Sequence, residues 1–208
     1  MKTYHIASYS KITPTEFSVN GGTMLLRNPE SQDLWLHDIY RALNMNYPKF
    51  FKMDKLCKSG ILAAEPIMQN FIVNPDEIIT NWAIIGMNSV SSLDDDTEYQ
   101  ATIQNENNYF PSPSVFVYTL ANIVIGELAI KYKIQGETSF YIEQLFNTQS
   151  FIINVIKTFE VNPQIEYALC GWINYYEENC DVMMMVITTN PDKSILEFNE
   201  TNINQIYY

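Results

Sequence analysis

The chain has 208 residues, of which 47% are hydrophobic and 17% are charged. This length and composition suit one domain with a substantial core, and they exclude a disordered tail. Twelve basic residues against twenty-four acidic ones give a net charge of −12. Such a charge argues against bulk electrostatic binding of nucleic acid or anionic lipid.

No stretch reaches the roughly 18–20 apolar residues that a membrane-spanning helix needs, and the first residues lack the apolar core of a signal peptide. We therefore expect a cytoplasmic protein. Cys57, Cys170 and Cys180 have no metal-ligand spacing and are expected to be buried, reduced thiols. Because His5 and His37 are the only histidines, we do not expect a histidine-based metal site. No GxGxxG or GxxxxGK(S/T) motif occurs, and we expect no cofactor.

Predicted strands and helices alternate along the first half of the chain. Residues 3–11 alternate loosely in polarity, as an edge strand or a first strand would. Residues 33–43 have helical character. The clearest helix spans residues 52–71, where apolar residues recur at three- and four-residue steps. Residues 82–87 (WAIIGM) are continuously apolar, which is typical of a buried strand.

The second half begins with a polar, acidic segment at residues 88–108, which reads as a loop with Asp94, Asp95 and Asp96 in a row. A long apolar helix is predicted at residues 115–133, a strand at 138–142 and an amphipathic helix at 148–160. Two strands at residues 165–175 and 181–188 are predicted to form a hairpin. This order predicts an α/β fold with a mixed, mostly parallel sheet, packed helices and a C-terminal antiparallel hairpin. Residues 191–208 read as a polar tail.

Three segments in this order resemble the N-terminal half of a β-ketoacyl synthase, a family with the thiolase fold. The first is KMDKLCKSGILAAEPIMQ, which starts at Lys52 and resembles the K/R-M-D helix of the family. The second is YFPSPSVFVYTLANIVIGELAI, at residues 109–130, and the third is GETSFYIE, at residues 136–143. The resemblance implies a β-ketoacyl-synthase-like, thiolase-like domain over residues 1–190, with the sequence ending near the middle of the duplicated fold.

In this family a cysteine nucleophile lies about nine residues after the glycine of the third segment, at the start of a buried helix. The corresponding stretch here is Ile142-Glu143-Gln144-Leu145-Phe146-Asn147, which contains no Cys, Ser or Thr. The elbow is thus degenerate at Glu143, Gln144 and Leu145, and no catalytic residue is assigned. Glu143-Gln144 also resembles chain-length-factor subunits of polyketide synthases, in which Gln replaces the Cys. An ordinary strand-to-helix turn is the alternative interpretation.

Lys49, Lys52, Lys55 and Lys58 place four of the twelve basic residues within ten positions. The resemblance implies that residues near the K-M-D motif dock an acidic acyl carrier protein, and Lys52 is the position that carries over directly. Lys49, Lys55 and Lys58 are added by proximity. A solvated helix face is the alternative interpretation of the same charges.

These features favour a non-catalytic, ketosynthase-like accessory subunit in type II fatty acid or polyketide biosynthesis, aryl polyene chains included. It would pair with a full-length ketosynthase and contact acyl carrier protein, as a heterodimer or, failing that, a homodimer, because the apolar helix at residues 115–133 needs burial. Two alternatives remain open. One is an unusual 3-oxoacyl-acyl-carrier-protein synthase completed in trans, and the other is an acyl-chain binding module.

Overall fold

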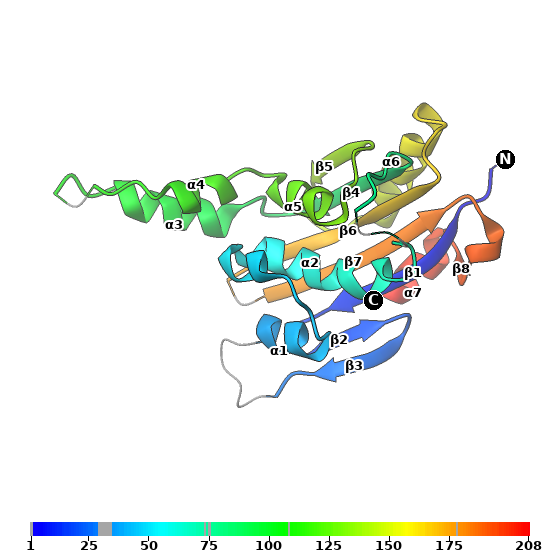
Figure 1. Cartoon of the computed structure of the whole chain (residues 1–208), viewed down its shortest axis with the longest axis horizontal. Coiled ribbons are helices and arrows are strands. Elements are labelled where there is room, and N and C mark those ends of the chain that lie inside the picture. The colour runs from blue at the N-terminus through cyan, green and yellow to red at the C-terminus, as the bar shows by residue number, and fades with distance from the viewer. Residues whose placement is uncertain (1, 29–34, 73, 75, 108, 178) are drawn as a thin grey trace.

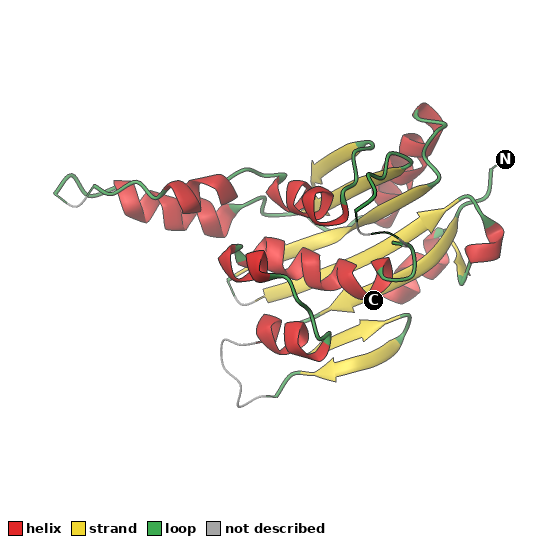
Figure 2. Ribbon diagram, viewed as in Figure 1, coloured by secondary structure: helices red, strands yellow, loops and turns green. Residues whose placement is uncertain are grey.

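One eight-stranded sheet runs through the protein, between two layers of helices (Figure 2). The computed structural model describes residues 2–28, 35–72, 74, 76–107, 109–177 and 179–208. Seven strands follow the order β3-β2-β1-β7-β6-β4-β5, and β8 pairs with β1 beyond this path (Figure 1). The two chain-terminal regions therefore meet in the sheet, because β1 bonds to β7 and β8.

The N-terminal strands form one side of the sheet. They are β1 (His5–Ile12), β2 (Glu16–Val19) and β3 (Gly22–Leu26). The turn between β2 and β3 holds Asn20 and Gly21 at φ values of 49° and 79°, which an Asn-Gly pair adopts at little cost. The first predicted strand is confirmed, but it lies inside the sheet between β2 and β7 rather than at its edge.

Four strands form the centre and the other edge of the sheet: β4 (Trp82–Asn88), β5 (Thr138–Ile142), β6 (Tyr167–Tyr176) and β7 (Asn179–Thr188). Only the pairs of β4 with β5 and with β6 are parallel among the described strands. The mixed α/β class and the β6–β7 hairpin are confirmed. The expected predominance of parallel pairing is corrected, since all other strand pairs of the sheet are antiparallel.

Strand β7 shows how the sheet divides the core. Met184 and its neighbours two residues away, Val182 and Val186, pack into one apolar cluster. Met183, Met185 and Ile187 pack into a second cluster on the other face. Successive side chains of a strand point to opposite faces, so a strand buried on both faces is apolar throughout. The same reasoning explains the continuous apolar run of β4, in which every residue is buried.

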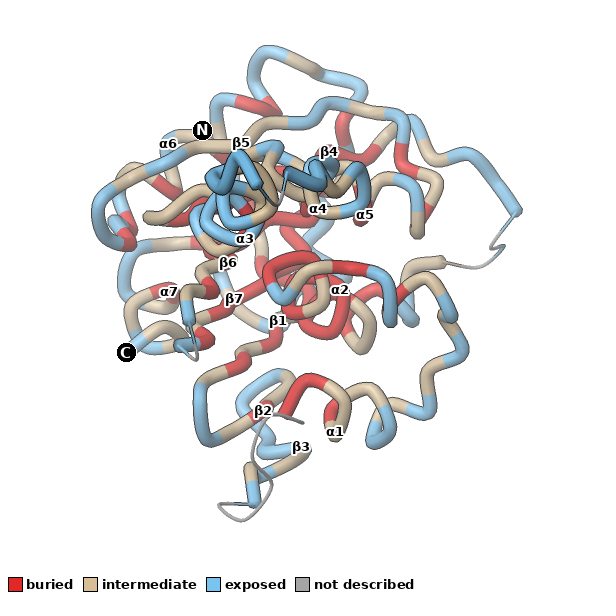
Figure 3. Tube along the Cα trace, turned by 90° about the vertical axis from the view of Figure 1, so that its left-hand side faces the viewer, coloured by how far each residue is buried: buried red, intermediate tan, exposed pale blue. Residues whose placement is uncertain are grey.

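The first helix layer covers one face of the sheet with α1 (Trp35–Ala42), η1 (Pro48–Lys52), α2 (Lys55–Met68) and α5 (Ile123–Tyr132). Helix α2 begins after Asp54, whose carboxylate accepts hydrogen bonds from the backbone N–H groups of Leu56 (3.0 Å) and Cys57 (3.1 Å). It is the most buried helix of the layer (Figure 3). A Cβ at Gly60 would lie 2.7 Å from Val124, so only glycine permits this close approach of α2 to α5.

The second layer holds α6 (Thr148–Val161) and α7 (Glu200–Tyr207) on the opposite face. The segment expected to be a polar tail instead forms η2 (Pro191–Lys193), β8 (Leu196–Glu197) and α7. Phe198 and Ile203 are buried in the second cluster, so these residues contribute to the core. The polar side chains of α7 obscure this in the sequence.

Two further helices, α3 (Leu93–Ile103) and α4 (Pro113–Tyr118), form an arm that extends away from the sheet (Figure 1). The acidic segment expected to be a loop is thus largely helical. The single helix expected at residues 115–133 is divided into α4 and α5. The Ser92 hydroxyl donates to the Thr119 carbonyl at 2.7 Å, which engages a backbone acceptor that a continuous helix would use itself. None of the helices in the described ranges is long and apolar enough to cross a membrane.

Candidate functional site

The stretch predicted to be a degenerate elbow lies where β5 ends and α6 begins. The Glu143 N–H donates to the Asn88 carbonyl at 2.9 Å, which extends the pairing of β5 with β4. The Glu143 carboxylate accepts a hydrogen bond from the Ser150 hydroxyl in the first turn of α6. Gln144 and Leu145 are exposed, Leu145 by 76%. The turn therefore presents an amide and an apolar side chain to solvent and offers no thiol or hydroxyl at the elbow.

None of the three cysteines lies at the predicted elbow. Cys57 lies in α2, Cys170 in β6 and Cys180 in β7, and all three are buried. Burial raises the thiol pKa of each above its ordinary value, and the nearby Asp54 carboxylate adds to this effect at Cys57. All three are therefore protonated at neutral pH, and they pack as small apolar side chains. No group of three or more His, Cys, Asp and Glu side chains is placed to hold a metal ion in the part of the chain that the structure describes.

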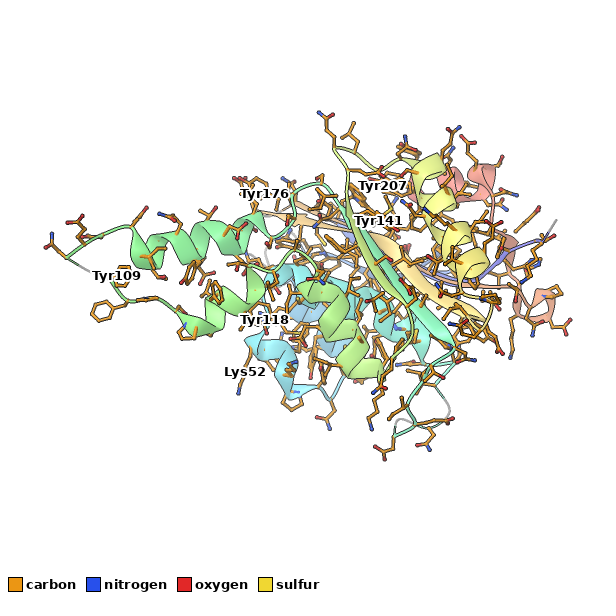
Figure 4. All side chains as sticks on the ribbon, turned by 90° about the horizontal axis from the view of Figure 1, so that it is seen from above. Lys52, Tyr109, Tyr118, Tyr141, Tyr176 and Tyr207 are labelled. Atoms are coloured by element: carbon orange, nitrogen blue, oxygen red, sulfur yellow. The ribbon has the colours of Figure 1, made fainter. Side chains whose placement is uncertain are left out.

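Of the four predicted docking lysines, Lys49 is held in an ion pair and Lys52 is exposed. Lys49, in η1, forms an ion pair with Glu127 of α5, whose side chain is only 5% exposed. This lysine therefore neutralises an internal carboxylate. Lys52 is exposed at the end of η1 and points away from the sheet (Figure 4).

Lys55 and Lys58 lie in the first turns of α2 and line two neighbouring cavities. The Lys55 ammonium lies 5.7 Å from the centre of the Tyr175 ring, and that of Lys58 lies 5.8 Å from the Phe50 ring. Burial and the neighbouring Lys55 lower the Lys58 pKa, although the Asp54 carboxylate opposes them. These two lysines thus share one side of α2, as residues three apart in a helix do.

A pair of carboxyl groups joins α2 to the base of the arm. Asp54, which caps α2, shares a hydrogen bond with Asp95 in the first turn of α3. Asp95 is only 7% exposed. Burial, followed by the Asp54 charge, raises the pKa of Asp95 to about 8. Two carboxyl groups bond to each other only if one keeps its proton, so the pair holds a proton at neutral pH.

Asp54 and Asp95 both line a cavity of about 430 Å³. Its lining includes Lys55 and Lys58 of α2, Asp94 and Glu98 of α3, and Glu177 between β6 and β7. The Asp94 carboxylate accepts a hydrogen bond from the Glu177 backbone N–H at 3.0 Å, which ties the arm to the β6–β7 hairpin. The cavity is therefore lined by charges of both signs.

The arm has an exposed apolar surface, and few of its residues are buried. In α4 no residue is buried, and in α3 only Asp95 is. Tyr99 and Phe116 pack against each other between the two helices, with ring centres 5.3 Å apart and ring planes tilted by 52°. Large apolar side chains nevertheless remain exposed along the arm, namely Leu93, Tyr109, Phe110, Phe116, Val117 and Leu120. Tyr109 lies near the far end of the arm (Figure 4).

The sequence interpretation missed the roles of Asp95 and of the arm. Three consecutive aspartates indicate a solvated loop by composition. The signal for a helix is nevertheless present, because Ser92 precedes Asp95 by three positions, as in a capping box, and acidic residues favour a first helical turn. The burial of Asp95 against Asp54 depends on a contact between residues 41 positions apart, which local patterns do not encode.

Comparisons of the sequence find no matching protein-family model and no matching curated protein. Solved structures do match the fold. The ishigamide ketosynthase/chain length factor superposes with a TM-score of 0.62 at 9% identity, over 93% of this chain and 64% of that chain. The ketosynthase (ApeO) in complex with its chain length factor (ApeC) from Xenorhabdus doucetiae gives 0.59 at 10% identity, over 90% of this chain and 79% of that chain.

A third similar structure is AntDE:AntF (apo), a type II PKS acyl-carrier protein in complex with its ketosynthase bound to the hexaketide. It gives a TM-score of 0.57 at 13% identity, over 90% of this chain and 62% of that chain. The protein thus spans less than two thirds of the length of the first and third of these chains. At these identities the likeness concerns the fold, and the protein has the mixed α/β, thiolase-like fold of ketosynthase and chain-length-factor chains.

Proposed function

We propose that the protein is a non-catalytic, ketosynthase-like accessory subunit in a type II polyketide or fatty acid pathway. It pairs there with an active β-ketoacyl-acyl-carrier-protein synthase. The observation that carries this proposal is a ketosynthase-type fold whose elbow, Glu143-Gln144-Leu145, has no nucleophile. Condensation of acyl chains requires a nucleophile that holds the acyl group, and the three buried thiols are far from an activated state.

The exposed apolar face of the arm supports the pairing. Phe110 is 75% exposed and Phe116 54%, and apolar patches of this kind are typical of interaction surfaces. Strand β5 lies at the edge of the sheet and carries Ile142, which is 55% exposed. An edge strand leaves backbone groups available for a partner. The similar structures named above include a ketosynthase in complex with its chain length factor.

Co-expression with each ketosynthase of the same genome tests the pairing. We expect one of them to co-purify with this chain, with a heterodimer mass by light scattering. Phe110→Asp together with Phe116→Asp should abolish the complex, because two buried charges in an apolar interface lack partners. Ile153→Asp is the matched control, since Ile153 is 62% exposed but lies on α6, in the opposite layer. Equal loss with both variants, or no complex at all, would contradict the pairing.

Turnover assays separate the accessory role from an enzyme completed in trans. The complex should condense acyl and malonyl groups only while the nucleophilic cysteine of the ketosynthase is intact. Glu143→Gln and Gln144→Ala should leave that turnover within about twofold of the unmodified complex. If either abolished turnover while the complex still formed, this chain would contribute to the chemistry and the non-catalytic proposal would fail.

We also propose that Lys52 and Lys55 contact acyl carrier protein. Lys52 is exposed, whereas Lys49 is engaged by Glu127. Lys52→Glu with Lys55→Glu should weaken a salt-sensitive interaction with carrier protein by about tenfold or more, because charge reversal converts attraction into repulsion. Lys157→Glu, on the exposed side of α6, is the matched control. Unchanged affinity in the double variant would exclude this docking site.

A further inference from the structure

A second cavity, of about 460 Å³, lies beside the 430 Å³ cavity that is lined by charges of both signs. Among the described residues, the charged ones that line the second cavity are all basic. Its walls come from the end of β3, from α1 and α2, and from the β6–β7 hairpin. Four basic side chains converge on it from three of these elements: Arg27, His37, Lys55 and Lys58. Trp35 and Tyr175 also line it.

No carboxylate lines this cavity among the residues that the structure describes. Two carboxylates of the described residues near this cavity have other partners. Asp38 pairs with Arg41 at 3.4 Å, and Asp54 accepts the N–H groups at the start of α2. In a chain with a net charge of −12, this grouping of basic residues is an exception to the overall charge.

The basic groups act on one another electrostatically. Burial, then Lys58 and then Arg41 lower the His37 pKa, and Asp38 opposes them only in part. Burial also lowers the Lys58 pKa, and Lys55 adds to this, while the Asp54 carboxylate opposes both. An anion in the cavity would relieve this repulsion and would gain charge-assisted hydrogen bonds.

We propose that this cavity binds the phosphate group of an organic phosphate, with Arg27, His37 and Lys58 as the anion-binding residues. The Arg27 guanidinium, which also donates to the Pro14 carbonyl at 3.3 Å, presents a planar set of N–H donors that suits phosphate. Lys58 and protonated His37 add two further donors. The volume exceeds that of a phosphate ion alone, so the organic part of the ligand lies against Trp35 and Tyr175. This inference does not depend on the proposed pairing with a ketosynthase.

The two histidines provide a reporter and an internal control. His37 lines the cavity, whereas His5 lies on β1, with Nδ1 3.1 Å from the Ser194 hydroxyl, and does not line it. Carbon–proton NMR spectra of the histidine rings should show saturable shifts of His37 on addition of inorganic phosphate. The His37 pKa should rise by about half a unit or more, because a bound anion stabilises the imidazolium. The ring signals of His5 should not move on addition of phosphate.

Arg27→Gln and Lys58→Gln should each weaken phosphate binding by about tenfold, as expected for the loss of one charge-assisted contact. Lys157→Gln removes the same charge from α6 and should leave binding unchanged. Two variants are used because Arg27 also bonds to Pro14, and thermal unfolding of each checks the fold. Parallel shifts of both histidines, equal shifts with sodium chloride at matched ionic strength, or unchanged binding in both variants would overturn the proposal.

The phosphate could belong to a free organic phosphate or to a carrier protein, and a further binding experiment distinguishes these two sources. A free organic phosphate predicts shifts of His37 with phosphate and with phenyl phosphate alone. A phosphate presented by a carrier protein predicts tighter binding of the carrier protein that bears its phosphopantetheine arm than of the same protein without it. A carrier protein that bound equally well in both forms would exclude the second source and leave the anion site itself intact.

Discussion

Helix α2 and the α3–α4 arm show two different ways in which this protein stabilises a helix. Both α2 and α3 have an aspartate at or near their start, Asp54 and Asp95 respectively. Ten of the fourteen residues of α2 are buried, so tertiary packing determines where it lies. The arm buries a single residue of α3 and none of α4. Burial supplies most of the stability of helices in proteins, so the arm has little of this stabilisation beyond its base.

The largest expected effect is in the tightly packed region. Gly60→Val would place a Cβ 2.7 Å from Val124 and 3.5 Å from Ile173, so α2 would have to move away from α5 and β6. We expect a loss of about 3 kcal/mol in the free energy of unfolding, measured by urea denaturation. Gly126→Ala in α5 is the matched control, because a Cβ there meets nothing within 4 Å, and it should be neutral or stabilising. An unchanged free energy of unfolding in Gly60→Val would show that α2 and α5 are not tightly packed at this position.

The buried ion pair between η1 and α5 should give the next largest effect. Lys49→Met leaves the Glu127 carboxylate, which is 5% exposed, without its cation. We expect the free energy of unfolding, measured by urea denaturation, to fall by about 2 kcal/mol. Combining Lys49→Met with Glu127→Gln should recover most of that loss, because the uncompensated charge is then gone. Failure of the second change to restore stability would indicate that the packing of Lys49, rather than its charge, matters.

At the junction of the two regions, stability should depend on pH. Because the Asp95 pKa is raised to about 8 from an ordinary 3.8, the folded protein retains a proton that the unfolded chain releases. The stabilising contribution is therefore complete below about pH 4 and is lost as the pH rises to about 8. Asp95→Asn should flatten this dependence and make the protein more stable at pH 8 by about 2 kcal/mol.

Asp96→Asn provides the control for the junction, since Asp96 is exposed in the same helical turn. It should leave the dependence of stability on pH unchanged. An identical pH profile for Asp95→Asn and the unmodified protein would rule out the shared proton between Asp54 and Asp95.

The smallest effect on folding is expected in the arm. Phe110→Ser and Phe116→Ser remove side chains that are 75% and 54% exposed, so each should change the unfolding free energy by less than about 0.5 kcal/mol. If the arm covers a partner, the same changes should weaken the complex far more than they weaken the fold. A loss of stability similar to that of Gly60→Val would mean that the arm packs on the body in solution.

Local patterns in the sequence predict the elements whose polarity matches their burial. These include the apolar runs of β1, β4, β6 and β7 and the apolar face of α2. Their apolar residues are the ones buried in the two core clusters, so the pattern of polarity shows each element without a structure. The absence of Cys, Ser and Thr from residues 142–147 is equally visible, whereas the assignment of these residues as a degenerate elbow stays a prediction.

Elements that depend on distant contacts are not visible in this way. Helix α7 has a polar sequence, yet Ile203 is fully buried against the sheet. The break between α4 and α5 depends on a hydrogen bond from Ser92, 27 positions before Thr119. The basic cavity joins Arg27, His37 and Lys58 from three elements, and no spacing in the chain marks them as neighbours. His37 in particular reads as an ordinary surface histidine.

The pairing of β1 with β7 also determines when the chain can fold during its synthesis. Ile12 lies opposite Val182, so roughly 170 residues separate the two partners. At ribosomal rates of about 5–20 residues per second, β1 and its hairpin wait on the order of ten to thirty seconds for their neighbour. Over that interval the apolar side chains of β1 have only β2 beside them in the sheet. The nascent chain is thus exposed to chaperones and to aggregation until its C-terminal third emerges, and mutations that slow the closing of this pair would lower yield without altering the finished fold.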